Sequence, residues 1–283
     1  MCLSFPQMPD KLTATEKEII EYIAGHNEEF LYMTIGQLAS TLNVSEATIS
    51  RFARHVGCDD FKHLKQTVME QTVQKGPAQK LANTLRTGDG GLLQNFIRQQ
   101  QYNLQKTLEL LEEGEFDRAV AAIVAAHRVF IHAKNASVSM GQLLEYRLRR
   151  IGIDVHRIPS GGTGVLEGLV PVRSDDLVIL FGFSKVSSEG QVILDYQKCV
   201  GYTTLMFTGQ LYQEEELQAD INLFVYRGGQ NEYHSMSAPG AIVDALAIAV
   251  AAHMGADAVK NLDTVRELKK KYRFTLQNSY KNQ

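Results

Sequence analysis

The stretch TIGQLASTLNVSEATISRFARHVG, residues 34–57, constrains the fold more than any other part of the chain. Thr34, followed three residues later by a glutamine, is the pattern of a capping box that starts a helix. Asn43 tolerates the left-handed backbone of a sharp turn, and Ser45 is a typical N-cap for a second helix, which Gly57 ends. Apolar residues recur at helical spacing in both segments. The stretch therefore predicts two short helices joined by a tight turn, a helix-turn-helix.

A further helix is expected ahead of this motif. Thr15 and Glu18 have the spacing of a capping box, and isoleucines at 19, 20 and 23 form an apolar stripe that extends to about Ala24. Three helices with facing apolar stripes are enough for a small core. We therefore expect an all-α N-terminal domain over residues 1–75.

The outward face of the second motif helix carries small, polar and basic side chains, which allow a helix to enter the major groove of DNA. The basic residues lie on or just after this helix, whereas the acidic residues cluster further towards the N-terminus, at Glu16, Glu18, Glu21, Glu28 and Glu29. A solvated helix face is the alternative interpretation. The candidate DNA-binding residues are Ser45, Glu46, Ala47, Thr48, Ser50, Arg51, Arg54, Lys62 and Lys65.

Composition narrows the remaining choices. The chain has 283 residues, a formal net charge of −3 and three cysteines that are far apart. These cysteines form no CxxC pair and no disulfide framework, and no apolar run reaches the roughly 20 residues of a membrane span. The first residues lack the pattern of a secretory signal. We expect a cytoplasmic protein with no cofactor, no metal site and no membrane partner.

After the first domain the pattern of predicted secondary structure changes. A glycine-rich stretch and a helix over about 92–113 form a linker at 76–114, and strands then alternate with helices over 115–275, before a short tail at 276–283. Such alternation predicts an α/β domain with a parallel sheet covered by helices on both faces. Ligands of such sheets bind at the carboxyl ends of the strands, against helix N-termini.

Four loops expected at that edge are rich in hydroxyl groups and small residues, at 133–139, 159–164, 183–190 and 231–240. Hydroxyl groups and free backbone N–H groups at helix starts suit a phosphate, although simple helix capping explains any one loop equally well. The candidate ligand-binding residues are Asn135, Ser137, Ser184, Lys185, Ser187, Ser235 and Ser237.

Both halves resemble one bacterial family. VSEATISRFARHVGCDDFKHLK resembles the RpiR family of transcriptional regulators, and ASVSMGQLLEYRLRRIG is similar to the first helix of its sugar isomerase (SIS) domain. The resemblance implies an operator-binding homodimer or higher homo-oligomer with a phosphosugar effector. The family's ligand loops read GxGxS and SxSGxT. Here Ala133 and Asn135 replace the two glycines, Gly182 replaces the first serine, Lys185 the later glycine and Ser187 the threonine.

Two alternatives stay open. A constitutive DNA-binding regulator with a degenerate, dimerising SIS domain is consistent with the altered loops. A sugar-phosphate aldose–ketose isomerase needs a general base, for which the candidates are Glu189, Glu232, His132 and His234. An N-terminal DNA-reading domain gives catalysis no evident purpose, so we expect no enzyme and assign no catalytic residue.

Overall fold

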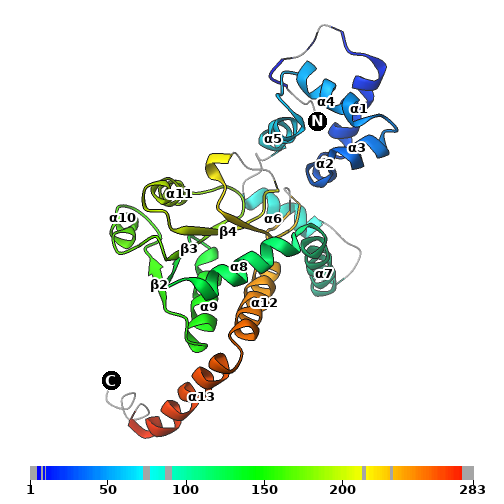
Figure 1. Cartoon of the computed structure of the whole chain (residues 1–283). Coiled ribbons are helices and arrows are strands. Elements are labelled where there is room, and N and C mark those ends of the chain that lie inside the picture. Colours follow the sequence, from blue (N-terminus) through cyan, green and yellow to red (C-terminus); the bar gives the residue numbers. More distant parts are fainter. Residues whose placement is uncertain are drawn as a thin grey trace. The chain divides into compact units, whose positions relative to one another are not determined.

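The computed structural model describes residues 5–7, 9, 11–72, 77–86, 91–211, 215–229 and 232–275. They fall into two compact units (Figure 1). The N-terminal unit comprises residues 1–99, 211–213 and 228–234, and the C-terminal unit comprises the rest. The predicted tail at 276–283 and the linker residues Gly76, Gly88 and Gly90 lie outside the described residues.

The N-terminal unit is helical. Its elements are α1 (Ala14–Gly25), α2 (Asn27–Tyr32), α3 (Ile35–Thr41), α4 (Glu46–His55), α5 (Phe61–Thr72), α6 (Pro77–Arg86) and the first half of α7 (Leu92–Leu110). Buried side chains from α1 to α5 form one core, in which Phe30, Phe52 and Leu64 are almost completely buried. The all-α expectation for this part of the chain is confirmed.

Helix α1 begins two residues earlier than its sequence indicates. Thr13, and not Thr15, is the N-cap, and its capping-box partner is Glu16. Glu16 also lies 2.6 Å from Nδ1 of His55 at the end of α4. Burial opposes ionisation of this carboxyl, but the hydrogen bonds from Thr13 and His55 prevail and lower the pKa of Glu16. The Glu16 carboxylate thus caps the N-terminus of α1 and also binds His55 of α4.

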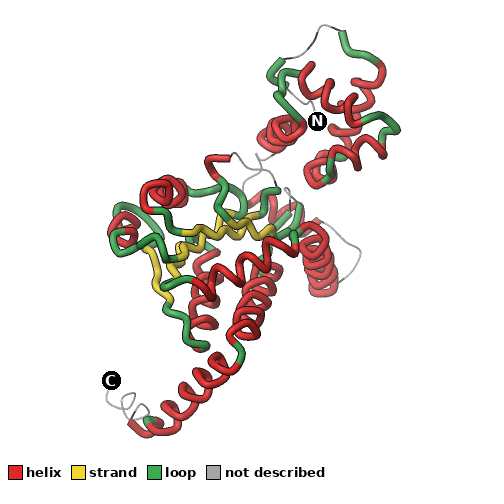
Figure 2. The backbone as a smooth tube through the Cα atoms, in the orientation of Figure 1, coloured by secondary structure: helices red, strands yellow, loops and turns green. Residues whose placement is uncertain are grey.

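The C-terminal unit alternates strands with helices (Figure 2). After α8 (Glu113–Ala125) come β1 (Val129–His132), α9 (Ser137–Arg150), β2 (Val155–Ile158), α10 (Gly164–Leu169), β3 (Leu177–Gly182), α11 (Ser188–Val200) and β4 (Thr203–Thr208). The short 3-10 helix η1 (Glu215–Leu217), β5 (Ile221–Phe224), α12 (Ser237–Met254) and α13 (Ala256–Lys271) complete it.

The five strands form one parallel sheet in the order β2-β1-β3-β4-β5. Apolar side chains of α8, α9 and α12 cover one face, and those of α10 and α11 cover the other. Strands buried on both faces have continuous apolar sequences, as in VFIH of β1 and LVILFG of β3. The expected α/β fold is confirmed.

The sheet order creates a switch point between β1 and β3. These strands are neighbours, but the chain leaves β1 towards β2 and leaves β3 towards β4, on the opposite side. The loops that follow them therefore diverge, and ligands of open α/β sheets bind where this occurs. The residues that matter are those directly after His132 and Gly182.

Helix α12 is long and strongly apolar. Its 18 residues have a mean hydropathy of 1.5 and are long enough to cross a membrane by length and composition, and 33% of this window is buried. Val243, Leu246 and Val250 pack in the core with α8 and α9. One face of α12 therefore packs in the core of the C-terminal unit, while Ile248 on another face is exposed.

Candidate nucleic-acid interface and anion site

Helices α3 and α4 form the predicted helix-turn-helix. Thr34 and Gln37 make a complete capping box at the start of α3. Asn43 has a φ of 51° in the turn, and the N–H of Val44 donates to the carbonyl of Ala39 at 2.9 Å. Ser45 caps α4 through the N–H of Thr48 at 3.1 Å. The caps and the left-handed turn residue fix the angle at which α4 leaves α3.

One face of α4 packs on the core and the other faces solvent. Ile49, Phe52 and Ala53 are buried, whereas Arg51 and Arg54 are exposed. Thr48 Oγ1 lies 3.5 Å from an Arg51 terminal nitrogen, which orients that guanidinium along the helix. Of the remaining predicted contact residues on α4, Ser45, Glu46 and Ala47 are exposed and Thr48 and Ser50 are half-buried.

Glu46 lies close to α3. A Cβ added at Gly36 would stand 2.8 Å from Glu46 Oε1, so the Glu46 side chain would have to shift if residue 36 were larger. A negative charge in the first turn of α4 interacts favourably with the helix dipole. Glu46 therefore lies at the exposed start of α4, beside Gly36 of α3.

Lys65 is not an exposed phosphate contact, and that prediction is wrong. Its side chain is 1% exposed, and Nζ donates to the carbonyl oxygens of Leu31 and Met33 at the end of α2. Burial lowers the pKa of Lys65 to about 7. Helix α2 was not predicted from the sequence, and the carbonyl groups at the end of that helix hold this amine. Lys62, one turn earlier on α5, is exposed and stays a candidate.

At the switch point an ion pair joins the two diverging loops. Lys134 follows β1, Glu189 lies in the first turn of α11, and Lys134 Nζ is 2.7 Å from Glu189 Oε1. The hydrogen bond from Lys134 and the backbone N–H of Glu189 lower the pKa of Glu189 to about 2. Lys134 was absent from the predicted ligand set, because it occupies a variable position of the expected loop motif.

His132, the last residue of β1, lies near this pair. It is 3% exposed, and neither ring nitrogen makes a hydrogen bond of good geometry with another described residue, although the Pro159 carbonyl is close enough to act on the ring. Burial lowers the pKa of His132, while the Pro159 carbonyl and Glu189 act in the opposite direction and Lys134 reinforces the decrease. A buried imidazole without a well-aligned hydrogen bond is costly unless something binds to it.

The loop after β3 carries the predicted residues Ser184, Lys185 and Ser187. Ser187 is the N-cap of α11 and accepts from the N–H of Gly190 at 3.1 Å. Ser184 Oγ accepts from an Arg227 terminal nitrogen at 3.1 Å, and that guanidinium lies 4.2 Å from the centroid of the Phe183 ring. Arg227 is thus a cation that the sequence interpretation missed. Lys185 is exposed and forms no ion pair among the described residues.

The loop after β1 keeps a glycine-like backbone despite its substitutions. Asn135 has a φ of 55°, in the left-handed region that glycine normally supplies. A Cβ at Gly141 of α9 would be 3.1 Å from the Cβ of Ala133, so the missing side chain at 141 makes room for Ala133. Ser137 is the first residue of α9 and is buried.

The remaining predicted ligand residues lie at the start of α12. Ser235 and Ser237 share a hydrogen bond of 2.9 Å between their hydroxyl oxygens, and the Ser235 N–H donates to the carbonyl of Arg227. Residues Ser184, Arg227 and Ser235 are therefore connected directly. The structure does not bring Asn135 or Lys185 into a hydrogen bond with them.

The two other residues considered as a general base belong to the N-terminal unit. Glu232 accepts from the N–H of Gly229 at 2.9 Å and from Gln99 at 3.3 Å. His234 Nε2 lies 3.2 Å from the carbonyl oxygen of Gly229 and 3.5 Å from Lys80 Nζ. Both side chains hold the 228–234 segment to its own unit, so a structural explanation accounts for them.

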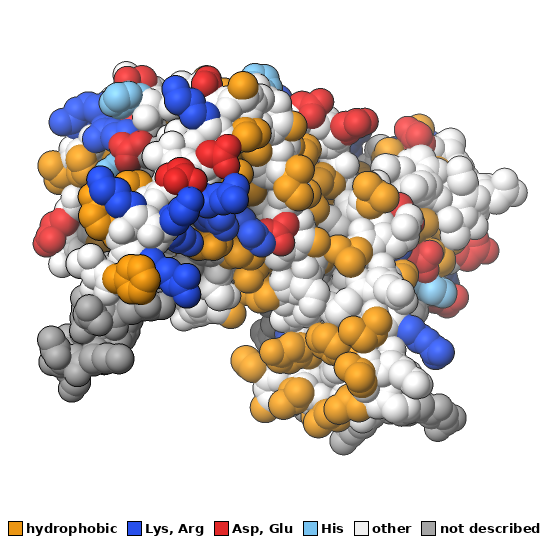
Figure 3. Space-filling view, turned by 90° about the horizontal axis from the view of Figure 1, so that it is seen from below, with side chains coloured by type: hydrophobic (Ala, Val, Ile, Leu, Met, Phe, Trp, Pro, Cys, Tyr) orange, Lys and Arg blue, Asp and Glu red, His pale blue; other side chains and the backbone are white. Residues whose placement is uncertain are grey.

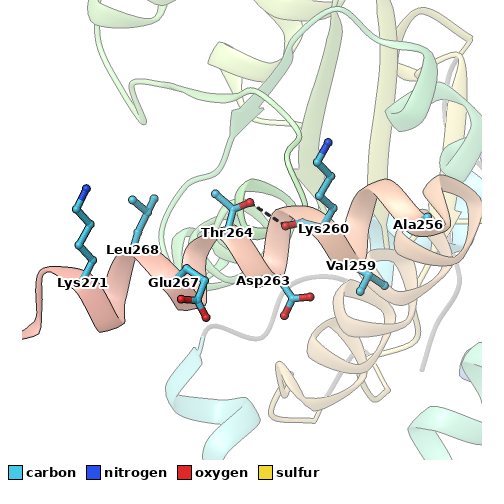
Figure 4. A pocket seen from close by; sticks show the side chains of 8 residues that line it. All are labelled: Ala256, Val259, Lys260, Asp263, Thr264, Glu267, Leu268 and Lys271. Carbon is cyan, nitrogen blue, oxygen red and sulfur yellow. Dashed lines mark hydrogen bonds between the residues drawn. The ribbon is translucent and has the colours of Figure 1, made fainter.

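A hollow of about 660 Å³ runs along α13, but its lining argues against a ligand site (Figure 4). All its residues come from one helix. Lys260 and Lys271 point to one side of that helix, and Asp263 and Glu267 point to the other. Side chains that diverge in this way do not converge on one molecule.

Comparisons with known proteins agree with this architecture. A family model described as helix-turn-helix domain, rpiR family, matches residues 3–75. A helix-turn-helix-type transcriptional regulator of Caldanaerobacter subterraneus is 25% identical over 277 residues, covering 93% of this chain and 94% of the relative. One of Bacillus subtilis is 23% identical over 228 residues, with coverages of 77% and 76%.

Solved structures share the fold. The sugar isomerase domain of an RpiR transcription factor from Sphaerobacter thermophilus matches with a TM-score of 0.57 and 23% identity, covering 62% of this chain and 97% of that one. The Vibrio vulnificus NanR protein complexed with ManNAc-6P matches with a TM-score of 0.56 and 17% identity, over 93% and 95%. The chain therefore has an RpiR-family helix-turn-helix domain at its N-terminus, followed by a domain with the SIS fold.

Proposed function

We propose that this protein is a DNA-binding transcriptional regulator whose C-terminal unit senses a phosphorylated sugar or a related anionic metabolite. The proposal rests on two sites that occur in one chain. One is a capped helix-turn-helix with exposed arginines, and the other is a switch point where cationic side chains lie near helix N-termini. The first suits a DNA duplex, and the second suits a phosphate.

DNA binding is supported by the exposed face of α4. Arg51 and Arg54 are long enough to reach base edges or phosphates, and the small Ala47 and Ser50 allow close approach to the groove. The test is selection of binding sites from the source genome with the full chain, followed by fluorescence anisotropy at several salt concentrations. Specific binding should exceed binding to random duplex by about 10³-fold or more.

Anion sensing is supported by Lys134, Arg227 and the N-terminus of α11. The backbone at Asn135 also argues that the loop after β1 retains its shape although glycines are missing. Because the NanR structure contains ManNAc-6P, phosphorylated sugars form the first panel. Operator binding is measured with and without each sugar phosphate. A panel that leaves operator affinity unchanged at millimolar concentration favours the constitutive regulator instead.

A homo-oligomer is part of the proposal. A single helix-turn-helix makes few contacts, and two copies at successive major grooves supply additional affinity. Exposed apolar side chains on α6 and the first half of α7 offer a surface for pairing, and Figure 3 shows such a patch. The patch consists of Leu81, Leu85, Leu92, Leu93, Phe96 and Ile97. The expected location of this regulator is the cytoplasm, where its operator would be.

Isomerase activity is the weaker candidate. A general base works best with a pKa near the working pH, but Lys134 and the α11 backbone hold the pKa of Glu189 at about 2. His132 is buried, and burial lowers its pKa. The groups at the switch point are therefore better arranged to hold an anion than to remove a proton from carbon.

A further inference from the structure

The ion pair at the switch point uses the same groups that an anionic ligand would need. Glu189 takes the Lys134 ammonium through Oε1 at 2.7 Å, and its own backbone N–H at the start of α11 stabilises the same carboxylate. A free cation and a helix N-terminus are the two features that bind phosphate groups. In this structure the Glu189 side chain already binds both the Lys134 ammonium and the N-terminus of α11.

The carboxylate is not fully satisfied in this position. Glu189 Oε2 is buried and has no hydrogen-bond partner of good geometry among the described residues. His132 is 3% exposed, makes no hydrogen bond of good geometry among the described residues, and is electrostatically coupled to Glu189 and Lys134. Unsatisfied buried polar atoms cost free energy. A ligand with more acceptor oxygens than the Glu189 carboxylate can also accept a hydrogen bond from His132, which Glu189 does not use.

The surroundings leave room for an exchange of partners. The Lys134 side chain is 42% exposed, so a solute can reach its ammonium group. The glycine-rich loop after β2 lies beside the carboxylate, since a Cβ at Gly161 would stand in van der Waals contact, 3.7 Å from Glu189 Oε1. The Glu189 side chain is itself 16% exposed, so both partners of the ion pair reach solvent.

We propose that Glu189 is an internal competitor for the ligand: its carboxylate occupies the anion position on Lys134 and α11, and an effector binds there by displacing it. This inference rests on the proposed anion-sensing function and names the ligand chemistry that the site selects. A phosphate monoester carries up to two negative charges and three acceptor oxygens, so it competes with a carboxylate. A neutral sugar lacks this charge, and a monocarboxylate brings only the single charge and the two oxygens that Glu189 already supplies.

Inorganic phosphate is the probe, titrated calorimetrically into the full chain without DNA. Glu189→Gln removes the competing charge but keeps the size of the side chain, and we expect phosphate to bind about 10-fold tighter than to the wild type, the scale of one charge-assisted hydrogen bond. Lys134→Met removes the cation, so it should abolish phosphate binding and, in the double variant, cancel the gain from Glu189→Gln. Asp195→Asn, an equal charge change at an exposed position of the same helix, should stay within about two-fold of the wild type.

The sign of the Glu189→Gln effect decides the question. If Glu189 only positions Lys134 for the ligand, Glu189→Gln weakens phosphate binding or leaves it unchanged, and the inference fails. Binding by neither the wild type nor Glu189→Gln overturns it too. Glu189→Ala repeats the test if circular dichroism shows Glu189→Gln to be misfolded. The two proposals can fail separately. If Glu189→Gln binds phosphate more tightly but no phosphosugar changes the operator affinity of the wild type, Glu189 is a competitor for anions and the proposed sensing function is wrong.

Discussion

The side-chain amine of Lys65 lies 3.2 Å from the carbonyl oxygen of Leu31 and also donates to the carbonyl of Met33. A neutral amine has two N–H groups, which is enough for two carbonyls. Burial lowers the pKa of Lys65 from 10.5 to about 7, so the folded unit holds this proton less tightly than the unfolded chain does. Lys65 thus connects α5 to the end of α2, and the free-energy cost of burying its amine depends on pH.

We expect the stability of the helix-turn-helix unit to rise with pH between about 7 and 10.5. In that range the unfolded chain binds a proton at Lys65 that the folded unit does not, so raising the pH reduces the penalty; below pH 7 both states are protonated and the penalty is constant. Over the whole range a pKa shift of this size corresponds to at most about 5 kcal/mol. Hydrogen exchange of α4 amides, compared at each pH with Lys65→Met, measures it. An equal pH dependence in Lys65→Met contradicts the assignment.

Arg51→Ala should weaken operator binding by roughly 1–3 kcal/mol, the scale of a lost base contact. Arg51 projects from the exposed face of α4, where Thr48 orients it. Fluorescence anisotropy with operator and random duplexes separates the effects, because only operator binding should decrease. Lys198→Ala on α11 removes the same charge away from the motif and serves as the control. Unchanged operator affinity in a folded Arg51→Ala protein removes Arg51 from the interface.

Lys62→Ala should instead weaken operator and random DNA alike. Lys62 is exposed at the start of α5, and a phosphate contact carries no sequence information. The slope of log K against log salt should decrease in magnitude by about one unit. A loss confined to the operator would show that Lys62 reads bases.

The same residues show what the sequence does and does not predict. Local signals were sufficient where the cause is local: the Thr34 cap, the left-handed Asn43 and the apolar strands of the sheet. Lys65 was misjudged because its partners are the carbonyls of α2, more than 30 residues away, and no local pattern marks them. Contacts between distant segments also form the switch-point pair, since Lys134 and Glu189 are 55 residues apart.

Leu93→Asp together with Ile97→Asp should weaken self-association at least about 100-fold. Both side chains are exposed, 73% and 49%, one turn apart on α7, and burying each against a second copy contributes about 1.5–3 kcal/mol. Light scattering over a concentration series measures the change. Leu166→Asp, an equally exposed leucine on α10, is the control. An oligomer that persists in the double variant at the wild-type concentration places the interface elsewhere.

The last prediction concerns communication between the two units. A ligand alters operator affinity only if it binds one arrangement of the protein better than another. A preference of about 1–3 kcal/mol changes operator affinity roughly 5- to 150-fold. Changing Ser184 and Ser187 to Ala should abolish this response, because Ser184 positions Arg227 and Ser187 shapes the N-terminus of α11. Operator affinity without ligand should stay unchanged.

Ser187 needs a variant that separates its two effects. It caps α11, so Ser187→Ala alone destabilises the unit by about 0.5–2 kcal/mol, and fraying of the helix is then a second explanation for a lost response. Ser187→Asp keeps an efficient N-cap but places a negative charge where the anion would bind, so it should stay stable and still fail to respond. Ser139→Ala, at an exposed position of α9, should respond normally. A normal effector response of Ser187→Asp would show that the anion binds away from the start of α11.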